Sequence, residues 1–308
     1  MAKKSVPFSQ DPHEVRLTKD AVIGRMAEGL YQIHPEQWVP DATGYILDEW
    51  QRRLIRNLFI GSNQKPDATI FDWEKGKKAR LSCKACHGSG KSFMAGIVTH
   101  FFLCNYIRSK VAITGITGKQ TSKQIWGYVS EVWGRSVFKE DIDLFGTTMK
   151  MKPAPESWFA TWVTSKEPKS IEGFHGPEDS KNLLWIVEES KGVADAVFEA
   201  IQGALSAEHN YWYISSTCGT AHGFFFDTFY SKKDEWENIS VPYYESTRIS
   251  AEQVRKWEKA WDGRDSSRFR ARALAEFPEE DDFVVVPESW FRRAIVHQDD
   301  DDDLGEAA

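Results

Sequence analysis

Short, continuous apolar runs alternate along the chain with longer stretches in which apolar residues recur at helical spacing. Runs of this length bounded by polar segments predict strands that are buried on both faces of a sheet. They lie at residues 79–83, 111–114, 158–164, 183–187, 211–217 and 239–244. Residues 136–155 show no clear period and are interpreted as irregular.

Amphipathic helices are predicted between these runs. The first has Asp48 as a plausible N-cap, and its apolar face consists of Leu47, Trp50, Leu54, Ile55 and Leu58. A second helix opens at Lys91, and others are predicted at 119–133, 194–205 and 250–261. The alternation of strands and helices predicts an α/β fold, with a mainly parallel sheet that is flanked by helices.

The charge of the chain is unevenly distributed. The formal net charge is −7, but residues 276–308 hold twelve acidic and two basic side chains, and the rest of the chain holds 37 basic and 34 acidic ones. Local basic clusters are therefore a better guide to partners than the net charge. Two clusters, Lys75–Arg80 and Arg264–Arg272, are interpreted either as solvated surface or as contacts for the phosphates of a nucleic acid.

With 308 residues, the chain is long enough for one large α/β domain or two modest ones. Its four cysteines suggest a reducing compartment. Cys83 and Cys86 have CxxC spacing, but no second pair accompanies them at zinc spacing, so we expect two small residues in tight positions. No apolar run approaches the length of a membrane span, and the first residues lack the apolar core of a secretion signal.

The segment Gly-Ser-Gly-Lys-Ser, Gly88 to Ser92, stands between a predicted strand and a predicted helix. Glycines let backbone N–H groups approach phosphate oxygens, and a helix N-terminus adds partial positive charge. In such a loop Lys91 reaches the β- and γ-phosphates and the Ser92 hydroxyl ligates Mg²⁺. Ala85 stands where the strict pattern has glycine, and the alternative is a glycine-rich turn with a surface lysine. The flanking strand and helix favour a nucleotide site.

Two adjacent carboxylates, Glu188 and Glu189, end the apolar run that begins at residue 183. In an α/β sheet this end of a strand faces the ligand. Because side chains alternate along a strand, we expect the two to point differently: Glu188 toward a Mg²⁺ ion and Glu189 toward the attacking water, as its base. The alternative is a strand that merely ends in surface acids.

Other polar residues are candidates for the same site. Gln51 lies on the helix before the loop, where its amide reads the adenine edge or is simply exposed. Ser215, Ser216 and Thr217 end a buried strand, where they sense the γ-phosphate or form an ordinary turn. The predicted ATP-binding residues are Gln51, Ala85, Cys86, His87, Gly88, Ser89, Gly90, Lys91 and Ser92.

The motifs taken together resemble the ATPase domain of a bacteriophage terminase large subunit, across residues 44–294. The resemblance rests on LDEWQ, KACHGSGKS, VAITGITGKQTSKQIW, IEGFHG before LLWIVEE, VADAVFEAIQGAL, ISSTCGTAHGFFFDTF and AEFPEEDDFVVVPESWF, in this order. It implies a RecA-like P-loop fold of the ASCE group, with ATP and Mg²⁺ as cofactors and ATP hydrolysis that moves double-stranded DNA into a procapsid. The implied partners are further copies of the chain in a ring, the portal protein, the small terminase subunit and possibly a separate nuclease, all in the host cytoplasm and without a membrane.

The chain departs from the resemblance at two points. The nuclease half of such proteins uses dispersed metal-binding aspartates, whereas Asp299–Asp303 are consecutive and predict a solvated acidic tail. We therefore expect no nuclease activity; a split gene, an isolated ATPase and a truncated chain all stay open. We expect residues 1–40 to form an N-terminal arm or a small cap, 41–275 the ATPase domain, and 276–308 a linker and tail.

The second departure concerns the arginine that such motors insert from a neighbouring subunit. No arginine lies between Arg135 and Arg248. The candidates for the cation that stabilises the transferred phosphoryl group are then Lys166, Lys169, Lys181, Arg248 and the cluster Arg264–Arg272. Lys84 stands where many terminases carry an arginine in the phosphate loop, so we predict that it acts catalytically within its own chain. The alternative functions are a helicase-like ATPase that remodels nucleic acid and a regulatory protein switched by nucleotide.

Overall fold

The computed structural model describes residues 16–60, 80–116, 119–165, 171, 174, 182–205 and 210–278. The strands are β1 (Arg80–Ala85), β2 (Lys110–Gly115), β3 (Ile142–Phe145), β4 (Thr148–Met151), β5 (Phe159–Trp162), β6 (Leu183–Glu188), β7 (Tyr211–Ser216) and β8 (Glu237–Val241). The helices are α1 (Lys19–Ala27), α2 (Leu30–Ile33), α3 (Pro35–Thr43), α4 (Glu49–Phe59), α5 (Lys91–Asn105), α6 (Lys119–Arg135), α8 (Asp195–Ala204), α9 (Phe224–Asp227), α10 (Ala251–Ala260) and α11 (Ser267–Arg272).

The strands form one sheet in the order β3-β4-β5-β2-β6-β7-β1-β8. From β5 to β8 the neighbouring strands run parallel. A parallel sheet is covered on both faces, which explains why every residue of β6 and β7 is buried and why these strands are continuous apolar runs. The predicted α/β fold with a mainly parallel sheet is confirmed. Each of the six predicted strands is present, and their ends differ from the prediction by up to three residues.

Residues 136–155 are not irregular as predicted. They contain β3 and β4, an antiparallel hairpin that pairs through β4 with β5 and extends the sheet at one edge. The signal in the sequence is a short alternation: Thr148 and Lys150 are partly exposed, whereas Met149 and Met151 are buried. Each strand has only four residues, so the period is too short to separate from a loop.

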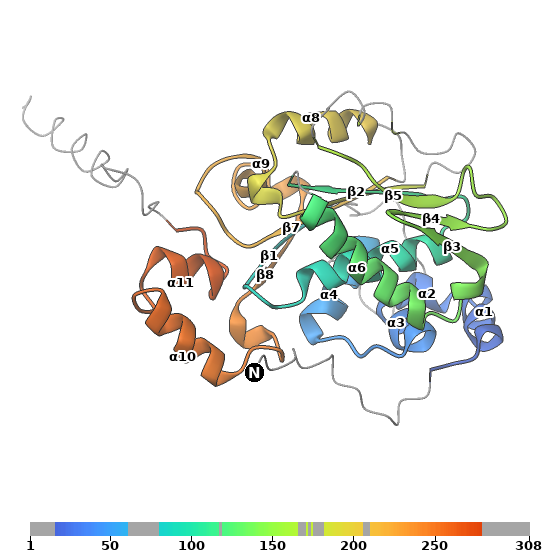
Figure 1. Ribbon diagram of the computed structural model, residues 1–308, viewed down its shortest axis with the longest axis horizontal. Coiled ribbons are helices and arrows are strands. Elements are labelled where there is room, and N and C mark those ends of the chain that lie inside the picture. Colours follow the sequence, from blue (N-terminus) through green and yellow to red (C-terminus); the bar gives the residue numbers. More distant parts are fainter. Residues whose placement is uncertain are drawn as a thin grey trace, which may run out of the picture.

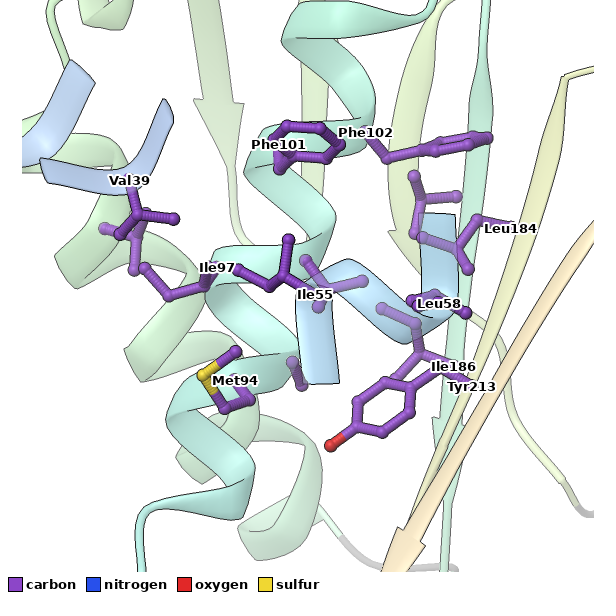
Figure 2. Close-up of a cluster of buried hydrophobic side chains, with 14 of the residues drawn as sticks. Val39, Ile55, Leu58, Met94, Ile97, Phe101, Phe102, Leu184, Ile186 and Tyr213 are labelled. Carbon is purple, nitrogen blue, oxygen red and sulfur yellow. The ribbon is translucent and has the colours of Figure 1, made fainter. Parts of the chain in front are cut away.

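Helices cover both faces of the sheet (Figure 1). On one face, Leu184 and Ile186 of β6 pack with side chains of α4 and α5 (Figure 2). On the other face, Trp185 and Val187 of the same strand pack with residues of α8 and α9, among them Phe198. Alternation along β6 therefore divides the core into two layers. None of the described helices is long and apolar enough to cross a membrane.

The helices α1 to α3 pack on the body of the domain. Tyr31, Trp38 and Val39 are buried in the core that α5 and the sheet share. The Trp38 ring meets the edge of Phe101 on α5, with ring centroids 5.6 Å apart. Residues 16–40 thus contribute to the main core of the domain, and residues 1–15 lie outside the described part.

Replacing Trp38 by alanine is expected to lower the free energy of unfolding by about 3–5 kcal/mol, because a fully buried indole leaves a cavity between α3 and α5. Chemical denaturation measures the change. Ile23→Ala is the matched control, since Ile23 lies on α1 of the same cap with 45% of its surface exposed, and we expect less than about 1 kcal/mol. Equal losses in the two variants would contradict the assigned role of Trp38.

Candidate active site

The phosphate loop connects β1 to α5. Gly88 and Gly90 have φ angles of +76° and +99°, a region that favours glycine, and Gly90 is the N-cap of α5. Ala85 is the last residue of β1 and pairs with Val241 of β8, so its extended backbone does not need glycine there. The departure from the strict glycine pattern at Ala85 therefore leaves the loop geometry intact.

Backbone donors divide the loop into two parts. The N–H groups of Cys86 and His87 donate to the carbonyls of Val241 and Arg272, at 2.8 and 2.7 Å. The N–H groups of Gly90, Lys91 and Ser92 open a helix, where intrahelical acceptors do not exist. The second part of the loop therefore offers a phosphate more backbone donors than the first. The side chains of Cys86 and Ser89 are fully buried in the protein interior.

Lys91 and Glu189 form an ion pair at the mouth of the loop, with 3.0 Å between Nζ and Oε1. Burial opposes the charged form of Lys91, which is only 7% exposed, but Glu189 and Glu188 outweigh it and raise the pKa of the lysine. The fold therefore brings Lys91 together with the two carboxylates at the end of β6. The ammonium group lies where the helix N-terminus also attracts anions.

Glu188 is fully buried at the end of β6. Its Oε1 accepts a hydrogen bond of 2.5 Å from the Ser215 hydroxyl of the neighbouring strand, and the Ser92 hydroxyl is close enough to lower its pKa. Burial is nevertheless the largest influence and raises the pKa to about 7. Among the described residues, no group donates a hydrogen bond to Oε2. A buried carboxylate oxygen without a partner is a suitable ligand for a cation.

Glu189 and Glu188 have different partners for a reason other than strand alternation. The strand ends at Glu188, and Glu189 has a left-handed backbone with φ of +52°. This turn aims its carboxylate at Lys91 and brings Oε2 to 3.5 Å from the Ser216 hydroxyl. The Glu189 side chain is 31% exposed, whereas Glu188 is fully buried. The two carboxylates are therefore separated into a buried one and a solvent-accessible one.

Gln51 is not exposed, which was the alternative to its predicted role at the adenine edge. The side chain is fully buried, and its Oε1 accepts the Asp48 N–H at 2.9 Å, which closes the first turn of α4. Its Nε2 lies against the phosphate loop, 3.4 Å from the position that a Cβ on Gly90 would take. In this arrangement Gln51 supports the loop. The signal for this role is its position three residues after the predicted N-cap.

The three hydroxyls at the end of β7 have three different partners. Ser215 donates to Glu188 and Ser216 to Glu189, whereas Thr217 Oγ1 accepts a hydrogen bond of 2.7 Å from the Lys191 ammonium group. This contact pattern follows from the parallel pairing of β6 and β7, in which Glu188 stands opposite Ser215. The end of β7 therefore contacts both carboxylates, and it brings in Lys191, which the sequence analysis did not single out.

Lys84 does not lie with these groups. Its neighbours on β1, Cys83 and Ala85, belong to the core layer that includes α5, so alternation directs Lys84 to the other face of the sheet. There its ammonium group lies over the rings of Phe229 and Phe277, 5.2 Å from each centroid. The position does not support the predicted catalytic role.

Arg248 reaches the phosphate loop of its own chain. A Cβ on Gly90 would lie 3.2 Å from Arg248 Nη1. The loop that carries this arginine is tied to α4, because Thr247 donates to the Asp48 carboxylate at 2.6 Å and Arg53 pairs with Glu245 at 2.9 Å. Arg248 was predicted only as one of several possible cations from a neighbouring subunit. Its proximity to the loop depends on β8 lying beside β1.

The cluster Arg264–Arg272 is largely engaged within the chain. Arg264 pairs with Glu258 at 3.3 Å and Arg270 with Glu276 at 2.9 Å, and the Arg272 guanidinium lies 5.9 Å from the centre of the Trp261 ring. These contacts make the cluster a poorer phosphate-binding surface than its composition suggests. Other predicted cations and acids, namely Lys75, Lys77, Lys78, Lys166, Lys169, Lys181 and Asp299–Asp303, lie outside the described residues.

Glu188→Gln is expected to stabilise the fold at pH 8 by roughly 1–3 kcal/mol and much less at pH 5. Burial raises the pKa of Glu188 from 4.5 to about 7. The protonated carboxyl therefore supports folding fully below pH about 4.5, and this contribution is lost as the pH rises through about 7. Glutamine is neutral throughout. Thermal unfolding at the two pH values measures the difference, and equal gains at both would contradict the raised pKa.

No model of a known protein family matches the chain. Over 219 residues, 68% of this chain and 44% of its relative, it is 24% identical to a probable terminase large subunit of Enterobacteria phage P7. The chain thus spans less than half the length of this curated relative.

Two solved structures share the fold. The large terminase of a thermophilic bacteriophage superposes with a TM-score of 0.57 at 8% identity, over 75% of this chain and 54% of that one. An ATPase-domain variant of the Thermus phage P74-26 large terminase gives 0.55 at 16% identity, over 82% and 98%. The predicted resemblance is confirmed: the chain is a homologue of a phage large terminase and has the fold of its ATPase domain.

Proposed function

We propose that this chain binds ATP at the phosphate loop and hydrolyses it. The observation that carries the proposal is the meeting of Lys91, at the start of α5, with two carboxylates of different exposure at the end of β6. A phosphate-binding turn alone would serve a switch protein equally well. An accessible carboxylate beside the loop adds a base for water, which favours turnover.

Each residue has a distinct task in this reaction. Lys91 and the N–H groups that open α5 neutralise and orient the β- and γ-phosphates. Arg248, at the edge of the same loop, adds a cation from within the chain. Glu189 accepts the proton of the attacking water once Lys91 has turned to the phosphates. Ser215 and Ser216 hold the two carboxylates in place.

Ser92 and Glu188 fit a Mg²⁺ site. Glu188 has one carboxylate oxygen without a hydrogen-bond partner among the described residues, and the Ser92 hydroxyl is close enough to the same carboxyl group to lower its pKa. Both side chains offer oxygen as a ligand. The described residues contain no cluster of three or more His, Cys, Asp or Glu ligands. That suits Mg²⁺, which takes one or two protein ligands and completes its shell with phosphates and waters. When bound, it supplies charge neutralisation to the transferred phosphoryl group.

We further propose that hydrolysis drives the packaging of double-stranded DNA into a procapsid. The support is the family resemblance: the P7 relative is a probable terminase large subunit, and the large terminase of the thermophilic bacteriophage has been solved with ADP and with ATP-gamma-S. The wider assembly belongs to the same proposal. It comprises a ring of identical subunits, the portal protein, the small subunit and, as a further candidate, a separate nuclease, in the host cytoplasm.

The test is ATP hydrolysis with and without duplex DNA at low and high salt. A motor holds phosphates transiently and without reading bases, so we expect random-sequence duplexes to stimulate turnover equally. We also expect apparent DNA affinity to fall by more than about tenfold between roughly 50 and 200 mM salt. Turnover that DNA fails to stimulate even at low salt would count against the motor, and turnover coupled to strand separation would favour a helicase.

A further inference from the structure

Lys191 links the catalytic carboxylate to the segment that follows β7. It lies in the short 3₁₀ turn Ser190–Gly192, two residues after Glu189. Its ammonium group donates to Thr217 Oγ1 at 2.7 Å and to the Cys218 carbonyl at 3.4 Å. Its aliphatic stem lies flat on Gly219, where an added Cβ would be 3.0 Å from Cδ of the lysine. One side chain thus spans the backbone of residues 217–219.

Glu189 lies within the electrostatic reach of two lysines. Lys91 holds its carboxylate at 3.0 Å. Lys191 also responds to it: burial lowers the pKa of Lys191, Glu189 opposes that effect, and the nearby cations Arg272 and Lys91 add to it. Lys191 is therefore a cation whose hydrogen bonds go to two uncharged groups, with a carboxylate close by that is paired to another lysine.

We propose that Glu189 exchanges Lys91 for Lys191 when a nucleoside triphosphate occupies the loop, and that this exchange releases residues 217–219. The inference rests on the proposed function, because phosphates must draw Lys91 away. The triphosphate carries more negative charge than one carboxylate, so Lys91 moves to it. Glu189 is then left with Lys191 as a neighbouring cation. An ammonium bonds more strongly to a carboxylate than to a hydroxyl or a carbonyl.

The segment 217–219 lies beside a cavity and continues along the chain to helix α9. A cavity of about 210 Å³ lies beside it, lined by Lys191, Thr220 and His222 among others. The segment leads into α9, whose first N–H, that of Phe224, donates to the Asp195 carboxylate at 3.1 Å. Movement of residues 217–223 would therefore reach α9 and its aromatic neighbours. Lys191 is a positioning residue and not a catalytic one, because it responds to a nucleoside triphosphate in the phosphate loop only through its contact with Glu189.

Hydrogen exchange of the full chain in ADP and in ATP-gamma-S, each with Mg²⁺, tests the exchange of partners. We expect the peptide over residues 217–223 to exchange about tenfold faster in the triphosphate state. The segment then loses its two hydrogen bonds to the Lys191 ammonium group and opens more often. Lys191→Met keeps the stem on Gly219 but removes the ammonium, and should abolish the difference. Lys191→Arg should restore part of it. Lys232→Met is the matched control, a lysine whose ammonium lies 4.3 Å from the centre of the Phe224 ring.

The loop peptide 86–92 separates the two possible failures. Protection of this peptide by nucleotide in every variant shows that the nucleotide site is intact and the variants are folded. If Lys191→Met then keeps the wild-type difference at 217–223, or the wild type shows none, the exchange of partners is wrong although the nucleotide site stands. If neither nucleotide protects 86–92 in the wild type, the proposed nucleotide site itself fails, and the inference with it.

Discussion

Lys91→Ala is expected to lower ATP turnover by at least about a thousandfold while leaving the chain folded. The ammonium group neutralises charge that grows on the phosphates in the transition state, and no other lysine is placed at the first turn of α5. Loss of its ion pair is tolerated structurally because Glu189 is 31% exposed and becomes hydrated. Phosphate release measures turnover, and circular dichroism checks the fold.

Lys232→Ala is the control for Lys91→Ala, because it removes a lysine whose ammonium group lies over the Phe224 ring of α9. We expect turnover within about threefold of wild type for this variant, as is usual for surface positions. Near-wild-type hydrolysis by a folded Lys91→Ala protein would overturn the assignment of the phosphate loop. A protein that unfolds instead would show in the same spectra and would call for Lys91→Met.

Glu189→Gln is expected to bind ATP with Mg²⁺ but to hydrolyse it at least about a hundredfold more slowly. Glutamine keeps the size of the side chain and its contacts with Lys91 and Ser216, but it cannot take a proton from water. Glu188→Gln should behave differently, because this buried carboxylate is the proposed Mg²⁺ ligand beside Ser92. We expect weaker Mg²⁺-dependent nucleotide binding there. Fluorescent-nucleotide titrations with and without Mg²⁺ separate the two effects.

The two glutamine variants control each other, since the residues are adjacent and the substitution is the same. Normal turnover in both would show that the end of β6 is not catalytic. A reversed pattern, with the binding defect in Glu189→Gln, would exchange the roles of the two carboxylates. The exposure of each side chain argues against that exchange, because an attacking water needs access and Glu188 is fully enclosed.

Features that depend on neighbouring residues in sequence were predictable. Helix α4 and its N-cap, the strand and helix around the phosphate loop, and the buried β6 each follow from a local pattern of apolar residues, glycines and caps. The sequence alone therefore determined the α/β class, the position of Lys91 at the start of α5, and the position of two carboxylates where β6 ends. The hairpin of β3 and β4 was missed because its strands are too short to show a period.

Features that depend on which strands become neighbours were decided only by the tertiary structure. Because β1 lies between β7 and β8, the carbonyls of Val241 and Arg272 hold the start of the loop and Arg248 reaches Gly90. Because β6 lies beside β7, Lys191 bonds to Thr217. These partners are 26 or more residues apart in the chain, and no local propensity relates them.

The same reasoning explains where two predicted site residues lie. Lys84 and Gln51 stand at positions that a motif assigns to the nucleotide, but a motif does not specify the direction of a side chain. Strand alternation and the packing of Phe229 and Phe277 direct Lys84 to the opposite face of the sheet, and the first turn of α4 encloses Gln51 against the loop. The sequence determined which chemistry is present, whereas packing between distant elements decided which of these groups meet.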